Sequence, residues 1–172
     1  MILLDANFLI TLSKRNSDAI WLLTFFKAQG AKQIVGIPAP SWAEVLSLAG
    51  PATSALSRIV QGRSFVQIIP FDEMAAIESA YVHQQVLLKS GNKKGASSAP
   101  WQKIKIDRQI LAIAVARRAT AIYTDDTDLR ADAGLIGIQT LGMDDISLPP
   151  EQLTLLSDED PDIPETKPSE AF

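Results

Sequence analysis

The sequence predicts an α/β fold in which helices cover both faces of a central, mainly parallel β-sheet of four to five strands. Short apolar runs rich in β-branched residues alternate along the chain with longer segments of helical periodicity, a pattern typical of parallel sheets. The chain has 172 residues, of which 47% are hydrophobic, so it matches the size of one ordinary domain with a substantial core.

Five short segments have the length and composition of strands. The first is residues 1–4, an apolar run that ends at the carboxylate of Asp5. The others are residues 33–37, 65–69, 121–124 and 137–141, and we expect the last of these at an edge of the sheet.

Helical patterns lie between and beside these strands. We expect helices at residues 7–14, 17–29, 40–49, 52–62, 72–90 and 104–118. The last is the clearest, because Ile106, Ile110 and Ile113 form an apolar face that is followed by the basic pair Arg117 and Arg118.

Two segments depart from this regular pattern. Residues 89–105 contain five lysines, no acid and several Gly, Ser, Asn and Pro residues, which predicts a mobile basic loop. Residues 149–172 are rich in Pro, Asp, Glu, Ser and Thr and have too little apolar surface to offset their ordering entropy. We therefore expect one domain at residues 1–148 and a disordered acidic tail at residues 149–172.

The charge is unevenly distributed along the chain. The formal net charge is −4, but residues 143–172 hold nine acids and the single base Lys167, which leaves residues 1–142 with a balance of +4. A mildly basic body is compatible with a polyanionic substrate.

Composition also excludes several classes of site. The chain has no cysteine, which excludes disulfides, a thiolate zinc site and a cysteine nucleophile, and fits a reducing cytoplasm. The apolar start is short and is interrupted by Asp5 and Asn7, so we do not expect a signal peptide. No run approaches the roughly 20 apolar residues of a membrane span, and we expect a cytoplasmic protein.

Acidic residues gather where the predicted strands end and helices begin. Asp5 follows the first strand, and Thr124, Asp125, Asp126 and Asp128 follow or end the strand at 121–124. Asp107 opens a predicted helix, whose dipole would favour its ionised form, and Glu44 lies in the first turns of another. Because sites in open parallel sheets form at the carboxyl ends of the strands, these side chains are expected at one edge.

Each of these acids also has an ordinary structural explanation. Asp5 and Asp107 would serve as caps, and residues 124–128 as a polar loop. As a group, however, they favour a cation, because clustered carboxylates repel one another unless a cation lies among them. Magnesium prefers such hard oxygen ligands.

Four short motifs now appear in order along the chain. They are Asp5-Ala6-Asn7, Ser41-Trp42-Ala43-Glu44, the helical D-x-x-I-L-A-I-A of residues 107–114, and the T-x-D-x-D-L of residues 124–129. Their order and spacing resemble the PIN-domain family over roughly residues 1–142. The resemblance implies a three-layer α/β/α sandwich and a metal-dependent ribonuclease that hydrolyses phosphodiester bonds endonucleolytically.

The resemblance also implies a set of site residues. It makes Asp5, Glu44, Asp107 and Asp126 the carboxylates that hold catalytic Mg²⁺ or Mn²⁺, with Asp128 as a further metal ligand. Thr124 would orient a carboxylate or the attacking water through its hydroxyl, and Asn7 and Asp125 would be supporting polar residues. A one-residue shift in the end of the strand would exchange Asp125 with Asp126.

Single-domain PIN proteins of this size in prokaryotes are often VapC-type toxins of type II toxin–antitoxin pairs. That resemblance implies a homodimer that an antitoxin blocks, with a groove expected near the apolar residues 9–26. The long basic loop and the acidic tail are departures from a minimal toxin.

The basic loop is a candidate RNA-binding element. Its lysines and one aromatic residue would hold single-stranded RNA through phosphate contacts and stacking; they are Lys89, Lys93, Lys94, Trp101, Lys103 and Lys105. The alternative is a solvated loop without a ligand. His83 has no ligand partner at helical spacing, and we expect it to be structural or exposed.

Two other functions remain open from the sequence. One is a non-catalytic PIN-like domain that binds RNA or a protein partner. The other is a phosphatase of the haloacid dehalogenase type, which also begins with a strand ending in Asp. That family has D-x-D at this position, and Asn7 argues against it.

Overall fold

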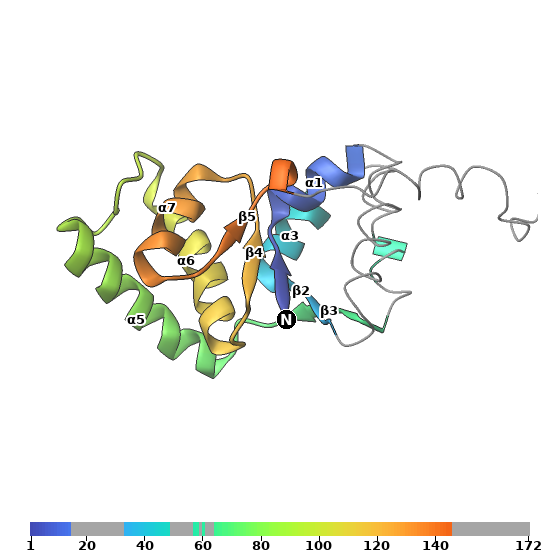
Figure 1. Ribbon diagram of the computed structural model, residues 1–172, viewed down its shortest axis with the longest axis horizontal. Coiled ribbons are helices and arrows are strands. Elements are labelled where there is room, and N and C mark those ends of the chain that lie inside the picture. Colours follow the sequence, from blue (N-terminus) through green and yellow to red (C-terminus); the bar gives the residue numbers. More distant parts are fainter. Residues whose placement is uncertain (15–32, 49–56, 59, 61–63, 146–172) are drawn as a thin grey trace, which may run out of the picture.

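A computed structural model describes residues 1–14, 33–48, 57–58, 60 and 64–145 (Figure 1). The helix expected at residues 17–29, nearly all of the one expected at 52–62, most of the expected antitoxin groove and the acidic tail at 149–172 lie outside the described residues. None of the described helices is long and apolar enough to cross a membrane.

The centre of the molecule is a sheet of five strands in the order β3-β2-β1-β4-β5. Every pairing is parallel, and Leu3 on β1 lies opposite Gly36 on β2 and Ile122 on β4. In chain order the strands are β1 (Ile2–Leu4), β2 (Val35–Pro38), β3 (Val66–Ile69), β4 (Ala121–Tyr123) and β5 (Thr140–Leu141). The parallel sheet and its five expected strands are therefore confirmed.

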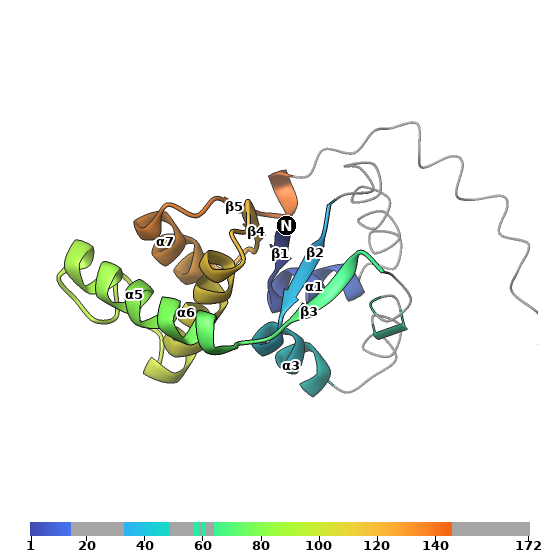
Figure 2. The ribbon, with the colours of Figure 1, turned by 90° about the horizontal axis from the view of Figure 1, so that it is seen from below.

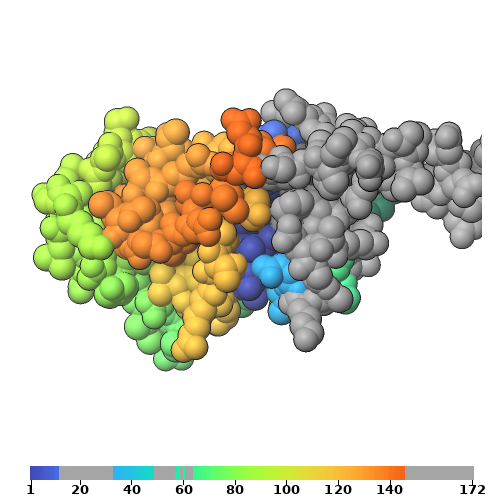
Figure 3. Space-filling model, viewed as in Figure 1, coloured from blue at the N-terminus to red at the C-terminus, as the bar shows by residue number. Residues whose placement is uncertain are grey.

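Helices cover both faces of this sheet (Figures 1 and 2). One layer contains α1 (Ala6–Lys14) and α3 (Ala39–Ser47), and the other contains α5 (Glu73–Ser90), α6 (Trp101–Ala116) and α7 (Thr127–Ile136). A short 3-10 helix, η1 (Met143–Asp145), follows β5. The three helices of the second layer form one continuous surface in the space-filling view (Figure 3). The expected three-layer α/β/α sandwich is confirmed.

The core is divided by the sheet into two clusters because successive strand residues face opposite sides. Ile2 and Leu4 of β1 pack with Phe8 of α1 and Val45 of α3. Leu3 packs on the other side, with apolar residues of α5, α6 and α7. This two-sided burial explains why β1 is apolar at every position.

The basic loop is shorter than the sequence indicated. Helix α5 continues to Ser90, where Gly91 ends it with a left-handed φ of 68°, and α6 already begins at Trp101. Pro100, with φ −57°, is the residue before α6, a position at which its fixed φ and missing N–H cost nothing. Lys89 therefore lies in α5, whereas Trp101, Lys103 and Lys105 lie in α6.

Helix α7 was not expected, because residues 124–128 predict a polar loop or a metal-binding run. The side chain of Asp126 caps it by accepting the amide N–H groups of Asp128 and Leu129, at 2.9 and 3.1 Å. Gly137 ends it with φ 79°. The helix places Asp126 at its amino end, at the edge of the sheet where β4 finishes.

Candidate active site

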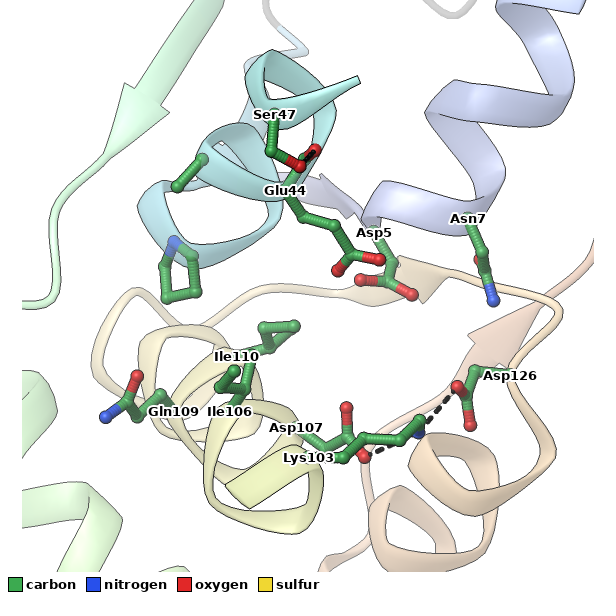
Figure 4. A pocket seen from close by; sticks show the side chains of 12 residues that line it. Asp5, Asn7, Glu44, Ser47, Lys103, Ile106, Asp107, Gln109, Ile110 and Asp126 are labelled. Atoms are coloured by element: carbon green, nitrogen blue, oxygen red, sulfur yellow. Dashed lines mark hydrogen bonds and ion pairs between the residues drawn. The ribbon is translucent and has the colours of Figure 1, made fainter. Parts of the chain in front are cut away.

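Four carboxylates line one pocket at the carboxyl edge of the sheet (Figure 4). Asp5 follows β1, Glu44 lies on α3, Asp107 on α6, and Asp126 between β4 and α7. The pocket has a volume of about 680 Å³, and Figure 4 shows Asp5 and Glu44 facing Asp107 and Asp126 across it. We call it the carboxylate pocket. The four acids predicted to form a metal site are thus brought together from four separate elements.

Asp5 is the most enclosed of these acids, with only 6% of its surface exposed. The hydroxyls of Thr124 and Ser41 donate to its two oxygens, at 2.9 and 3.1 Å. Burial raises the pKa of Asp5 even though these hydroxyls and the amide of Ala6 favour the charged form. Ser41 was quoted in a motif but given no role, and its contact with Asp5 shows why a small hydroxyl residue lies one turn before Glu44.

Lys103 lies between the other two aspartates. Its Nζ is 2.9 Å from Asp107 Oδ2 and 2.8 Å from Asp126 Oδ2, as the dashed lines in Figure 4 show. Burial lowers the pKa of Lys103, but its hydrogen bonds and ion pairs with the two aspartates outweigh this and hold the pKa above the ordinary value. We expected Lys103 in an RNA-binding loop; the structure places its ammonium in the carboxylate pocket.

The acids differ in how well their negative charge is compensated. Burial raises the pKa of Asp107 to about 6, although Lys103 acts in the opposite direction. Burial and the nearby charge of Asp5 raise the pKa of Glu44. Burial also acts to raise the pKa of Asp126, but Lys103 and the two capping amides more than reverse it, so its pKa is lowered. The pocket therefore has more negative charge than its one ammonium compensates.

The expected role of the helix dipole at Asp107 is wrong, because the helix starts earlier than predicted. Asp107 lies in the second turn of α6, beyond the free amide groups of the first turn, where the effect of the helix dipole has fallen off. Asp126, and not Asp107, lies directly at the amino end of a helix.

The supporting residues lie in different places. Asn7 lines the pocket, and its Oδ1 is 3.3 Å from both the Thr124 hydroxyl and the Asp125 amide nitrogen. The Asp125 carboxylate is outside the pocket lining and accepts the amide N–H of Met143 at 3.1 Å. Asp128, expected as a further metal ligand, accepts a hydrogen bond from the Ser97 hydroxyl at 2.8 Å. Its side chain does not line the carboxylate pocket either.

The other residues of the expected RNA-binding set are spread over the loop and the two helices. Lys89 donates to the carbonyl of Leu135, and Lys94 donates to the carbonyl of Ala99 at 3.0 Å. Lys93 Nζ lies 5.5 Å from the ring centroid of Trp101. Lys105 lines a second pocket that also contains Trp101.

The chemistry of the carboxylate pocket fits a hard divalent cation. Its donors are carboxylate oxygens, and the pKa values of Asp5, Glu44 and Asp107 are raised. A nearby cation would stabilise the ionised carboxylates and lower these pKa values. Within the described ranges no three acidic or imidazole side chains converge closely enough to coordinate one ion. Lys103 holds two of the carboxylates instead, and a metal ion would compete with its ammonium for them.

Comparisons with known proteins bear on the family and the fold. A sequence model of the family described as PIN domain matches residues 2–134. Among solved structures, the fold is similar to DNA-bound VapBC from Salmonella typhimurium, with a TM-score of 0.57 and 20% identity over 82% of this chain and 96% of that one. It is also similar to VapBC2 from Rickettsia felis bound to a promoter DNA fragment, with a TM-score of 0.56 and 15% identity over 83% and 98% of the two chains. No curated protein sequence matches significantly.

Proposed function

This chain belongs to the PIN-domain family, and from that premise we propose that it is a metal-dependent endoribonuclease, the toxin of a type II toxin–antitoxin pair. The observation that carries the proposal is the convergence of Asp5, Glu44, Asp107 and Asp126 in one pocket. Such a concentration of partly buried carboxylates destabilises the fold through repulsion and desolvation unless a cation binds among them.

The proposed cofactor is Mg²⁺ or Mn²⁺, held by these four carboxylates. When bound, such an ion neutralises charge on the scissile phosphate and makes water a better nucleophile. The protein's part is to position the reactants. Thr124 and Ser41 fix both oxygens of Asp5, and the α7 amides fix Asp126, so two of the acids are held rigidly.

We also propose that Lys103 contacts the RNA once a metal ion is bound. Its side chain is 41% exposed, so the ammonium is able to leave Asp107 and Asp126 when a metal ion replaces it. A displaced ammonium would remain beside the pocket, where it is suited to contact a phosphate of the RNA.

The proposal is tested by incubating a mixed RNA pool with the protein in Mn²⁺, in Mg²⁺ and in chelator, beside the Asp5→Asn variant. Metal-dependent cleavage that the variant lacks, with its melting temperature unchanged, would support the proposal. Folded protein that binds RNA without cutting it would indicate a non-catalytic binding domain. Hydrolysis of a phosphate monoester without RNA cleavage would indicate a phosphatase.

The proposed partners are an antitoxin protein and a second copy of this chain in the cytoplasm. Two of the structural neighbours are VapBC complexes bound to DNA, which supports an antitoxin partner. A surface suited to a homodimer lies on α5, where four large apolar side chains at helical spacing are each at least 49% exposed: Met74, Ile77, Tyr81 and Leu88. This stripe is our candidate dimer surface.

A further inference from the structure

A second pocket lies between α5 and α6, and we call it the α5–α6 pocket. Its volume is about 400 Å³, and its lining includes Ser79, His83, Gln84, Trp101, Lys105 and Arg108. On α6, Trp101, Lys105 and Arg108 share one helical face, whereas Lys103 and Asp107 share the opposite one. None of the described side chains that line the α5–α6 pocket is acidic, in contrast to the carboxylate pocket.

Arg108 is the unusual member of this lining, because it is only 2% exposed. Its Nε donates to Asp132 of α7 at 3.1 Å, and its Nη1 is 2.6 Å from His83 Nδ1. Its Nη2 is also buried and finds no acceptor in the described part of the chain. A buried charged donor without an acceptor costs free energy, and because Arg108 lines the pocket, a ligand oxygen that reached this atom would relieve that cost.

His83 and Trp101 complete the surroundings of the guanidinium. A guanidinium only donates hydrogen bonds, so His83 Nδ1 is the acceptor and the ring proton lies on Nε2. Burial and the charges of Arg108 and Lys93 lower the pKa of His83, which keeps the ring neutral at pH 7. The ring centroid of Trp101 is 5.6 Å from Arg108 Cζ, so the half-buried indole packs beside the guanidinium at the pocket.

The two pockets are neighbours across one helix. Gln109 of α6 lines both of them, so only the width of α6, about 10 Å with its side chains, separates the basic lining from the carboxylates. An extended polyanion that places one phosphate at the carboxylates is therefore able to place another in the α5–α6 pocket.

We propose that the α5–α6 pocket binds a phosphodiester of the RNA strand that is being cut, a few nucleotides from the scissile phosphate. Lys105 supplies positive charge, Arg108 supplies a guanidinium donor whose own charge is paired with Asp132, and His83 and Gln109 supply neutral donors. This inference rests on the proposed function and adds to it a subsite that holds the strand in register. The shared chemistry is a phosphate group, which free phosphate or a mononucleotide also offers.

The test measures RNA binding without cleavage. The full chain carrying Asp5→Asn is kept in chelator, and its affinity for a fluorescently labelled single-stranded RNA is measured by anisotropy at several salt concentrations. Adding Lys105→Gln is expected to weaken binding and to reduce the slope of log affinity against log salt by about 0.7, the value of one lost phosphate contact. Arg108 is left unchanged, because removing it would break a buried ion pair and endanger the fold.

Arg118→Gln is the matched control, because it removes the same charge from an exposed residue that follows the end of α6 and lines neither pocket. Its slope is expected to equal that of the parent. Equal losses in both variants would overturn the proposal, because they would show only general attraction between protein and RNA.

Two further arms identify the ligand and separate the two proposals. Inorganic phosphate that binds in a Lys105-dependent way, while the RNA slope does not depend on Lys105, would overturn the RNA assignment. Wild-type protein is also tested for cleavage of the same RNA in Mn²⁺. If wild type cleaves the RNA but the parent and Lys105→Gln have equal salt slopes, the subsite proposal fails and the nuclease proposal stands. If the slope depends on Lys105 but wild type does not cleave, the nuclease proposal fails and RNA binding at this pocket stands.

Discussion

Replacing Lys103 with Met should destabilise the metal-free protein and strengthen its response to metal. The ammonium lies 2.9 and 2.8 Å from Asp107 and Asp126, which at an effective dielectric constant of about 20 gives each pair a gross attraction of about 6 kcal/mol. Desolvation and about 2 kcal/mol of side-chain entropy oppose this attraction. We therefore expect a net loss of about 1–2 kcal/mol, between the values for surface and buried pairs.

The assay is thermal melting in chelator and in Mn²⁺. In chelator, Lys103→Met should lower the melting temperature by about 5 °C, and Met preserves the packing of the lysine stem. Mn²⁺ should then raise the melting temperature of the variant by more than it raises that of wild type, because no ammonium competes for the carboxylates. Lys105→Met is the control, since Lys105 is on the opposite face of α6. Equal stability in chelator, or equal shifts with Mn²⁺, would refute this reasoning.

Three other predictions concern stability and assembly. Burial raises the pKa of Asp107 to about 6, above the unfolded value of 3.8, so its favourable contribution is complete below about pH 4 and is lost as pH rises through 6. In chelator, Asp107→Asn should therefore gain stability over wild type as pH rises from about 4 to 7. Plots of melting temperature against pH that run parallel for the two proteins would contradict this. Asp132→Ala should cost about 3–5 kcal/mol in urea denaturation, because it leaves Arg108 buried without its carboxylate. Asp145→Ala should cost less than about 1 kcal/mol, because Asp145 is 51% exposed and its pair with Arg130 is a surface pair; similar costs for the two variants would show that burial is not the cause. Ile77→Glu should convert a dimer into a monomer in light scattering, and an unchanged mass would exclude the α5 stripe as the dimer surface.

The residues that could be predicted are those tied to a strong local pattern. The strand at 1–4 is apolar on both faces, so its end at Asp5 was visible in the sequence, and parallel topology then located the edge at which the acids meet. Asp107 was predicted from its motif, but the predicted start of its helix lies three residues after the observed start. The reason is that Trp101, Gln102 and Lys103 follow a proline in a polar stretch.

That error has a direct consequence for the site. With the helix start at Trp101, Lys103 and Asp107 are separated by one helical turn, which is the spacing of an ion pair. Taken as a loop residue, Lys103 carried no such prediction. Its second contact, with Asp126, joins α6 to the start of α7 and depends on tertiary packing that local sequence does not contain.

Helix α7 illustrates a signal that was present and misinterpreted. Asp126 as the cap, Leu129 and Ala133 on one buried face, and Gly137 at the end are ordinary marks of a helix. The density of acids at residues 125–128, however, is also typical of a polar loop or a metal-binding run. The cap and the site are compatible, because Asp126 accepts the α7 amides with one oxygen and faces Lys103 with the other.

The most direct test of the central claim compares two adjacent aspartates under the same substitution. Asp126 lines the carboxylate pocket, whereas the carboxylate of Asp125 lies outside it, and Asn retains the ability to cap α7. The measurement is the initial rate of RNA cleavage in Mn²⁺ for Asp126→Asn and Asp125→Asn. The carboxylate pocket as the catalytic centre predicts a loss of at least about 100-fold in Asp126→Asn and a rate near wild type in Asp125→Asn. Full activity in Asp126→Asn, or a loss confined to Asp125→Asn, would contradict it.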